Sequence, residues 1–300
     1  MATSGARGPA LAEDPPEVLP LRAAGRDVAE YVWNPQVALG NSPRPYLHPV
    51  RTLAGLVVTE AGPDSHRHQF GISIAAPDID GSNFWGGRTF VADHGPAWLD
   101  NHGSQRHQRW LHHTSGGLAH TLRWVSGDQR DLLHETRSLA CRPLSDTAWT
   151  LSTRSRLTNV TERPLTIRSP AALGRPGAGY GGFFWRGPAI TGTIAILSPL
   201  GNGVASVHGR TAAWTAVTCA GGEDGDWTVL FAPADEGTAR DRWFVRARDY
   251  LGVGSSLTWE SPLTLAPGES IERHIAAVIA DGAVSAATAA ELAATARSAR

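Results

Sequence analysis

Short runs of alternating apolar and polar residues, separated by turn-forming residues, extend along most of the chain. The clearest period-two pattern lies in residues 118–167, where four runs are joined by the turns SGDQ, RPLSD and TER. Alternation of this kind is typical of β-strands with one buried face, and strands joined by short turns form a meander. Similar runs continue from about residue 189 to 280. The pattern predicts an all-β protein.

The two ends of the chain differ from this pattern. Residues 1–17 are small, polar and Pro-rich, so we expect a disordered leader. Residues 283–296 are Ala-rich and predict a short C-terminal helix. Because the strand pattern shows no break in composition, we expect residues 18–300 to form a single large antiparallel β-sandwich domain ending in that helix.

Composition and charge narrow the function classes. The 300 residues carry a formal net charge of -1 and only 18% are charged, which argues against a nucleic-acid or anionic-membrane surface. Two cysteines make no disulfide framework, and the first twenty residues lack a secretory signal. No Gly-rich phosphate loop or nucleophile elbow occurs. We expect a cytoplasmic protein with a small-molecule partner, and the oligomeric state stays open.

Histidines are concentrated in one part of the chain. Ten of the 12 fall between His48 and His134. His66 and His68 are two residues apart, so an extended segment would place both rings on one side. Neutral imidazole serves either as an acid or base near pH 7 or as a ligand of a divalent metal, so both roles remain open. A further metal ligand would come from one of four side chains: His48, His102, His107 or Glu135.

Three Gly-flanked clusters combine aromatic residues with Arg or Asn, at residues 44–51, 82–89 and 174–187. Sugars stack their C–H faces on aromatic rings and take hydrogen bonds from Arg, Asn and His, so this mixture favours a carbohydrate pocket. The candidate substrate-binding residues are Arg44, Tyr46, Arg51, Asn83, Trp85, Arg88, His102, Arg175, Tyr180, Trp185 and Arg186.

Glu135 is the candidate catalytic carboxylate. The alternation in its segment places it on one strand face with Arg137 and the apolar Leu133, Leu139 and Cys141. A carboxylate on an apolar face either pairs with a cation such as Arg137 or has its pKa raised toward the range useful for acid and base work. Both interpretations remain open.

Several separated motifs resemble an uncharacterised bacterial family whose members often carry the label of a methane oxygenase. They are RPYLHPVRT, DSHRHQFGISIAAPDIDGSNFWGGR, NHGSQRH and SPAALGRPGAGYGGFFWRG, and the resemblance covers residues 40–282. It implies a β-sandwich similar to the galactose-mutarotase-like supersandwiches, found beside sugar-catabolic oxidoreductases. The label implies a membrane oxygenase, but no apolar run is long enough to span a bilayer, so we do not expect a methane monooxygenase.

These observations predict a carbohydrate-processing enzyme of epimerase, mutarotase or lyase type that acts on a sugar or a sugar-acid. His66, His68 or His48 would act as general acid or base opposite Glu135. A second hypothesis is a metal-dependent enzyme that uses the His48, His66 and His68 cluster, with a divalent metal held by His66 and His68. A third is a non-catalytic carbohydrate-binding or sensing module. The distances among these side chains distinguish the three hypotheses.

Overall fold

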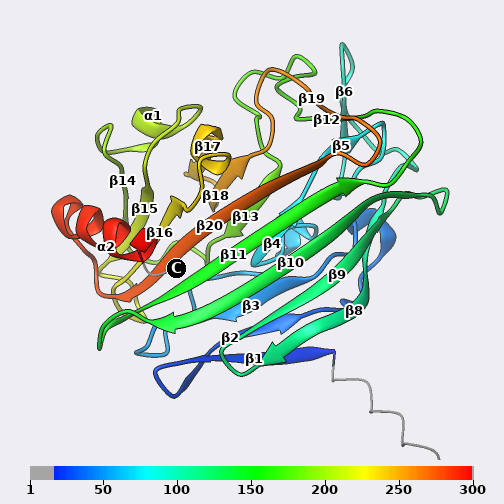
Figure 1. The fold of residues 1–300 in the computed structure, drawn as a ribbon. Coiled ribbons are helices and arrows are strands. Elements are labelled where there is room, and N and C mark those ends of the chain that lie inside the picture. The colour runs from blue at the N-terminus through cyan, green and yellow to red at the C-terminus, as the bar shows by residue number, and fades with distance from the viewer. Residues whose placement is uncertain (1–16, 299–300) are drawn as a thin grey trace, which may run out of the picture.

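The computed structural model describes residues 17–298, which form two large sheets packed face to face (Figure 1). All strand pairs in the described sheets are antiparallel, and the predicted all-β sandwich is confirmed. The predicted leader lies outside the described residues except for Glu17.

The first large sheet has seven strands. Their spatial order is β1 (Val18–Ala23), β2 (Arg26–Val32), β3 (Tyr46–Val50), β4 (Ile72–Ala75), β13 (Gly182–Arg186), β18 (Leu251–Ser256) and β17 (Arg242–Ala247).

The second large sheet has eight strands. Their spatial order is β14 (Thr193–Leu197), β15 (Thr215–Ala220), β16 (Trp227–Pro233), β20 (Ser270–Asp281), β11 (Ala148–Asn159), β10 (Asp131–Pro143), β9 (Gly117–Val125) and β8 (Ser104–Thr114).

Smaller elements complete the described chain. They are a three-stranded sheet of β19 (Leu263–Leu265), β12 (Leu165–Arg168) and β5 (Asp78–Ile79), a hairpin of β6 (Thr89–Val91) and β7 (Gly95–Ala97), the helices α1 (Val204–Val207) and α2 (Ala286–Ser298), and 3-10 turns at Leu39–Asn41, Asp64–His66 and Thr238–Arg240.

The predicted meander is confirmed for β9, β10 and β11, but its fourth run is not part of it. β20 pairs with the free side of β11, and β12 joins β19 and β5 instead. Among the runs between residues 189 and 280, the sequence GVASVHG at residues 203–209 also predicts a strand, and this prediction is wrong because the segment holds the short helix α1. Gly201 and Gly203 have φ of 120° and 89°, which interrupts an extended chain before the helix.

The main core lies between the two large sheets. The seven-stranded sheet contributes Trp185 and Val253, and the eight-stranded sheet contributes Trp149, Phe231 and Ile279. Burial of large apolar side chains from both inner faces is the dominant stabilising term of such a sandwich.

The C-terminal helix predicted at residues 283–296 forms as α2 on the outer face of the eight-stranded sheet (Figure 1). Ala289, Ala293 and Ala296 share one helix face and are buried against β16 and β20. Because alanine is small, the helix approaches the sheet closely.

The outer face of the seven-stranded sheet carries a second apolar layer. Phe184 of β13 and Phe244 of β17 point outward and pack with Trp85. Between them, β18 places Gly254 on this face, with Gly252 next to it along the strand, and a Cβ at Gly252 would lie 3.2 Å from the Phe184 ring. The missing side chains let aromatic rings lie directly on the strand. This layer supports the site described below.

Candidate functional site

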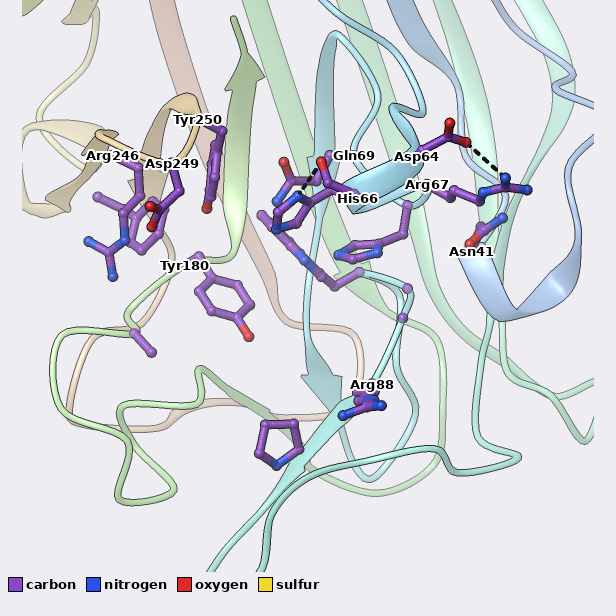
Figure 2. Close-up of a pocket in the computed structure, with 18 of the residues that line it drawn as sticks. Asn41, Asp64, His66, Arg67, Gln69, Arg88, Tyr180, Arg246, Asp249 and Tyr250 are labelled. Atoms are coloured by element: carbon purple, nitrogen blue, oxygen red, sulfur yellow. Dashed lines mark hydrogen bonds and ion pairs between the residues drawn. The ribbon is translucent and has the colours of Figure 1, made fainter. Parts of the chain in front are cut away.

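A pocket of about 620 Å³ opens above this aromatic layer (Figure 2). The segments at residues 64–69, 85–88, 96–98, 175–180 and 249–250 enclose it together with Asn41 and strand β17, so residues far apart in the sequence share one cavity. Its described lining residues are Asn41, Asp64, Ser65, His66, Arg67, His68, Gln69, Trp85, Gly86, Gly87, Arg88, Pro96, Trp98, Arg175, Ala178, Tyr180, Phe244, Arg246, Asp249 and Tyr250.

One wall of the pocket contains His66 and Tyr250. Their ring centroids are 5.0 Å apart, and the guanidinium of Arg186 lies over the Tyr250 ring at 4.6 Å. Arg186 is itself fixed by Glu60, whose Oε2 accepts hydrogen bonds from Nε at 3.0 Å and Nη2 at 2.7 Å. The wall is therefore held from behind by a partly buried ion pair.

Two glycines pack against the imidazole of His68. Gly86 and Gly87 have φ of 95° and 69°, and a Cβ at Gly87 would lie only 2.7 Å from Nδ1 of His68. The loop can therefore pass against the imidazole only because these positions lack side chains. The centroids of His66 and His68 are 6.0 Å apart.

Burial and positive charge keep both imidazoles neutral. Burial lowers the pKa of His68 to about 3, helped by the nearby guanidinium of Arg44. Burial and Arg186 lower the pKa of His66, while Glu60 partly opposes them. Both rings are therefore neutral at pH 7 and present a free ring nitrogen, and a pKa of about 3 makes His68 a weak base.

Aromatic rings line the remainder of the pocket. Trp98 is 64% exposed, whereas the predicted platform Trp85 is only 5% exposed and packs against Tyr180 with centroids 4.6 Å apart. Burial raises the pKa of Tyr180 although the positive charge of Arg175 opposes this, so its hydroxyl stays protonated. Figure 2 shows Tyr180 and Arg88 facing the same open space.

Arg44 lies beneath the pocket and ties its loops together. Its side chain is 1% exposed and donates to the carbonyl oxygens of Ser42 at 3.1 Å, Trp85 at 3.1 Å and His68 at 2.8 Å. These oxygens belong to three different loops. Arg44 is therefore a positioning residue for His68 and Trp85 and does not reach the cavity.

Asn83 and His102 shape the loop that carries the two glycines. Oδ1 of Asn83 accepts hydrogen bonds from the backbone N–H groups of Trp85 and Gly86, both at 2.8 Å. Nε2 of His102 donates to the carbonyl oxygen of Gly87 at 2.7 Å. Both side chains are buried and act on the loop rather than on the cavity.

A model of a family of unknown function, DUF6807, matches residues 19–294. The chain belongs to this family. The match agrees with the expected resemblance to an uncharacterised family and does not show the oxygenase activity. A comparison with curated proteins finds no significant match. In the described part of the chain, no helix is long and apolar enough to cross a membrane.

Solved structures similar to this DUF6807 protein include carbohydrate-active enzymes. A variant GH36 α-galactosidase from Geobacillus stearothermophilus, in complex with raffinose, is 13% identical with a TM-score of 0.45, over 89% of this chain and 41% of its own. A polysaccharide lyase is 10% identical with a TM-score of 0.35, over 85% and 32%. The heparan sulfate lyase of Pedobacter heparinus is 11% identical with a TM-score of 0.28, over 61% and 22%.

The DUF6807 chain thus spans less than half the length of each of these enzymes.

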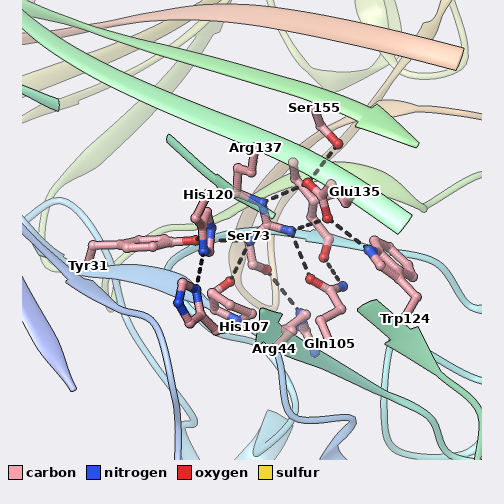
Figure 3. A network of polar contacts seen from close by, with 12 residues as sticks. Tyr31, Arg44, Ser73, Gln105, His107, His120, Trp124, Glu135, Arg137 and Ser155 are labelled. Carbon is pink, nitrogen blue, oxygen red and sulfur yellow. Dashed lines mark hydrogen bonds and ion pairs between the residues drawn. The ribbon is translucent and has the colours of Figure 1, made fainter. Parts of the chain in front are cut away.

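Glu135, the predicted partner of the histidines, does not line the pocket. It is 1% exposed between the two sheets, where Arg137 donates to both of its oxygens at 2.8 Å (Figure 3). Trp124 Nε1 and Ser155 Oγ donate to the same carboxylate at 2.8 and 2.7 Å. The alternation correctly places Glu135 and Arg137 on one buried face. Of the two interpretations of Glu135, the structure supports the ion pair with Arg137.

The same network continues toward the edge of the sandwich (Figure 3). Arg137 Nη1 donates to the Tyr31 hydroxyl at 3.4 Å, which is 2.8 Å from Nε2 of His120. Nδ1 of His120 is 2.9 Å from Nδ1 of His107. Thus His107, considered above as a metal ligand, lies in this network and not beside His66 and His68.

Four other predicted residues lie outside the pocket lining. His48 contacts Thr59, with Nδ1 3.0 Å from its Oγ1. Tyr46 stacks on Phe70 at 5.1 Å, and Arg51 donates to the carbonyl oxygen of Gly55 at 3.5 Å. Trp185 is fully buried in the core and donates to the carbonyl oxygen of Val58 at 2.8 Å. The structure therefore does not bring the binding clusters together as whole units.

Sequence reasoning misses Trp98, Arg246, Asp249 and Tyr250, which line the pocket. Residues 242–250 read as a plain strand, RWFVRARDY. Its alternation puts Trp243 and Val245 in the core and leaves Arg246 on the other face, which is the available signal.

No group of three or more His, Cys, Asp or Glu side chains that could hold a metal ion occurs among residues 17–298. His66 and His68 do share the pocket, but none of the expected further ligands joins them: His48, His102, His107 and Glu135 all have other neighbours.

Proposed function

We propose that this protein is a carbohydrate-processing enzyme whose reaction is a proton transfer in the pocket described above. The observation that carries the proposal is that two neutral imidazoles, His66 and His68, share one cavity with the aromatic rings of Trp98, Tyr180 and Tyr250. Sugars need an aromatic face for stacking and polar groups for their hydroxyls, and the cavity supplies both.

The chemistry assigned to the pocket needs a base and an acid. His66 accepts a proton from the substrate through its neutral ring nitrogen, and His68, a weaker base with a pKa of about 3, accepts a hydrogen bond from a substrate hydroxyl. Tyr180, whose hydroxyl is protonated, donates a proton to the substrate, and the guanidinium of Arg175 stabilises the phenolate that remains. This pairing of histidine with Tyr180 replaces the predicted pairing of histidine with Glu135. An acid and a base of this kind suit the reaction of an epimerase, a mutarotase or a lyase.

The test starts with a panel of neutral sugars, sugar acids and oligosaccharides. Binding is measured by calorimetry and turnover by NMR of the sugar signals. We expect His66→Asn to lower turnover by at least about tenfold, since general acid or base catalysis contributes about 10²–10⁴-fold, and His68→Ala to lower it by removing a hydrogen bond to the substrate. His112→Asn, an exposed histidine on β8, is the matched control and should turn over normally. Unchanged turnover in both pocket variants would refute the proposal.

A second candidate is a non-catalytic carbohydrate-binding module. The observation that favours it is the position of Glu135, which leaves the pocket without the expected pair of histidine and glutamate. In this case the panel would show binding that Trp98→Ala weakens, with no product from any sugar.

A further inference from the structure

The charges that line the pocket do not balance. Among the described lining residues, Arg67, Arg88, Arg175 and Arg246 face only two carboxylates. One of these, Asp64, is already paired with Arg67 at 2.8 Å. The pocket is therefore locally positive in a chain whose formal net charge is -1.

Unlike Arg67, the three remaining arginines of the lining have no carboxylate partner among the described residues. No ion pair within 4.0 Å joins Arg88, Arg175 or Arg246 to an acid in the part of the chain that the structure describes. The other lining carboxylate, Asp249, is exposed to solvent. Arginines that ring a cavity without carboxylate partners are available for a ligand anion.

Two of these guanidinium groups are held in place by aromatic rings. Arg246 lies over Phe244 at 4.5 Å and donates to the carbonyl oxygen of Gly177 at 3.2 Å. Arg175, two residues before that glycine, lies over Phe90 at 5.9 Å. Stacking and the bond to Gly177 hold the loop and β17 together, which reduces the ordering cost of binding an anion.

Positive charge also lies below the cavity. The hydrogen bonds of buried Arg44 to its surrounding carbonyl oxygens leave its charge uncompensated, and that charge is felt at His68. Because both pocket histidines are neutral, the positive charge that a ligand anion would meet comes from the guanidinium groups, which outnumber the lining carboxylates of Asp64 and Asp249. The field at the cavity thus favours a negatively charged ligand over a neutral one of the same size.

We propose that the pocket selects a sugar unit that bears an anionic substituent, with Arg88 and Arg175 holding the anion and Tyr180 and Trp98 contacting the ring. A carboxylate matches the planar fork of arginine in two parallel hydrogen bonds, so a uronate is the expected class. This inference rests on the proposed function, because it names the substrate of the same pocket.

The experiment compares sugars that differ only in the anionic group. Calorimetry with D-galacturonate and D-galactose, at low and at 0.5 M salt, measures how much more tightly the pocket binds the acidic sugar than the neutral one. We expect galacturonate to bind at least about tenfold more tightly at low salt, with the difference shrinking as salt screens the arginines. Glucose 6-sulfate and glucose 6-phosphate, compared with glucose, show whether another anion replaces the carboxylate. Tighter binding of either than of galacturonate would overturn the uronate assignment.

Two charge-neutral variants locate the anion. Arg88→Gln and Arg175→Gln should each remove most of the preference for galacturonate over galactose. Arg156→Gln, at an exposed position on β11 of the other sheet, is the matched control and should keep the full preference. Circular dichroism confirms that the variants fold.

The outcomes separate this inference from the proposed function. Equal binding of galactose and galacturonate, or a preference that survives both variants, overturns the acidic-sugar inference and leaves a carbohydrate pocket standing. If no sugar of the larger panel binds or is converted, the proposed function fails and the inference fails with it. A salt-independent preference likewise counts against the arginine cluster.

Discussion

The buried pair of Glu135 and Arg137 gives the sharpest test of the structure. The perturbation is Glu135→Ala, which removes a carboxylate that accepts four hydrogen bonds of 2.7–2.8 Å, two of them from Arg137. Arg137 would remain charged between the sheets, where its other acceptors are the neutral oxygens of Tyr31, Pro45 and Gln105.

The expected loss of stability follows from the burial of both charged side chains. The exposed fractions of the two side chains are 2% for Arg137 and 0% for Glu135. Removing one partner of a buried ion pair leaves an uncompensated charge and costs about 3–5 kcal/mol. The double variant Glu135→Leu with Arg137→Met removes both charges, so we expect it to lose less stability than Glu135→Ala alone.

The assay is equilibrium urea unfolding followed by circular dichroism. Glu272→Ala is the control, because its pair with Arg154 is exposed, at 41% and 50%, and such pairs contribute about 0–1 kcal/mol. Equal losses in Glu135→Ala and Glu272→Ala would show that the reasoning is wrong. Ligand affinity measured under native conditions should be unchanged in Glu135→Ala, since Glu135 lies outside the pocket lining.

Three further predictions concern the pocket and the core. Gly87→Ala should displace His68, whose Nδ1 would lie 2.7 Å from the new Cβ, and weaken ligand binding at least about tenfold. The control Gly55→Ala has a φ of 96° but open space around the new Cβ, so it should only strain the backbone, by about 1–3 kcal/mol. Calorimetry measures the loss of binding and urea unfolding measures the strain. NMR titration of His68 should give a pKa far below 6.5. The pKa of about 3 in the folded protein is below that of the unfolded chain, so the unfolded chain binds the proton first as the pH falls. The stability that the neutral ring contributes is therefore fully present above pH 6.5 and is lost as the pH falls toward 3. His68→Asn should then unfold less steeply with acid, and an identical acid profile would contradict this assignment. Trp185→Phe should cost about 1–3 kcal/mol in urea unfolding by leaving the carbonyl oxygen of Val58 without its 2.8 Å donor, and a change in ligand affinity would contradict its place in the core.

The pocket depends on loops whose convergence no local pattern encodes. His66, Trp85 and Tyr180 are recognisable as candidates from their own neighbourhoods, and the fold brings them to one cavity. Glu135 looks equally suitable in the sequence, yet its strand turns that side chain toward the other sheet. The difference lies in non-local packing: Arg44 gathers carbonyl oxygens from three loops separated by up to 43 residues, from Ser42 to Trp85.

Strand β13 shows where alternation loses its meaning. All five of its residues are buried, because loops cover its outer face while the core covers its inner face. Period two therefore cannot say whether Trp185 or its neighbour Phe184 faces the pocket side. The paired sheets place Trp185 inward and Phe184 under the pocket.

Local sequence was enough to establish most strands, the sandwich class and the buried face that Glu135 and Arg137 share, because side-chain alternation is a property of any extended chain. It also supplied candidate residues for the proposed sugar site. Which of those residues meet was decided by the tertiary fold, since the covering of the seven-stranded sheet by loops depends on contacts between distant segments. Those contacts turn Arg44, Asn83 and His102 into supports and leave His66, His68, Arg88 and Arg175 at the cavity.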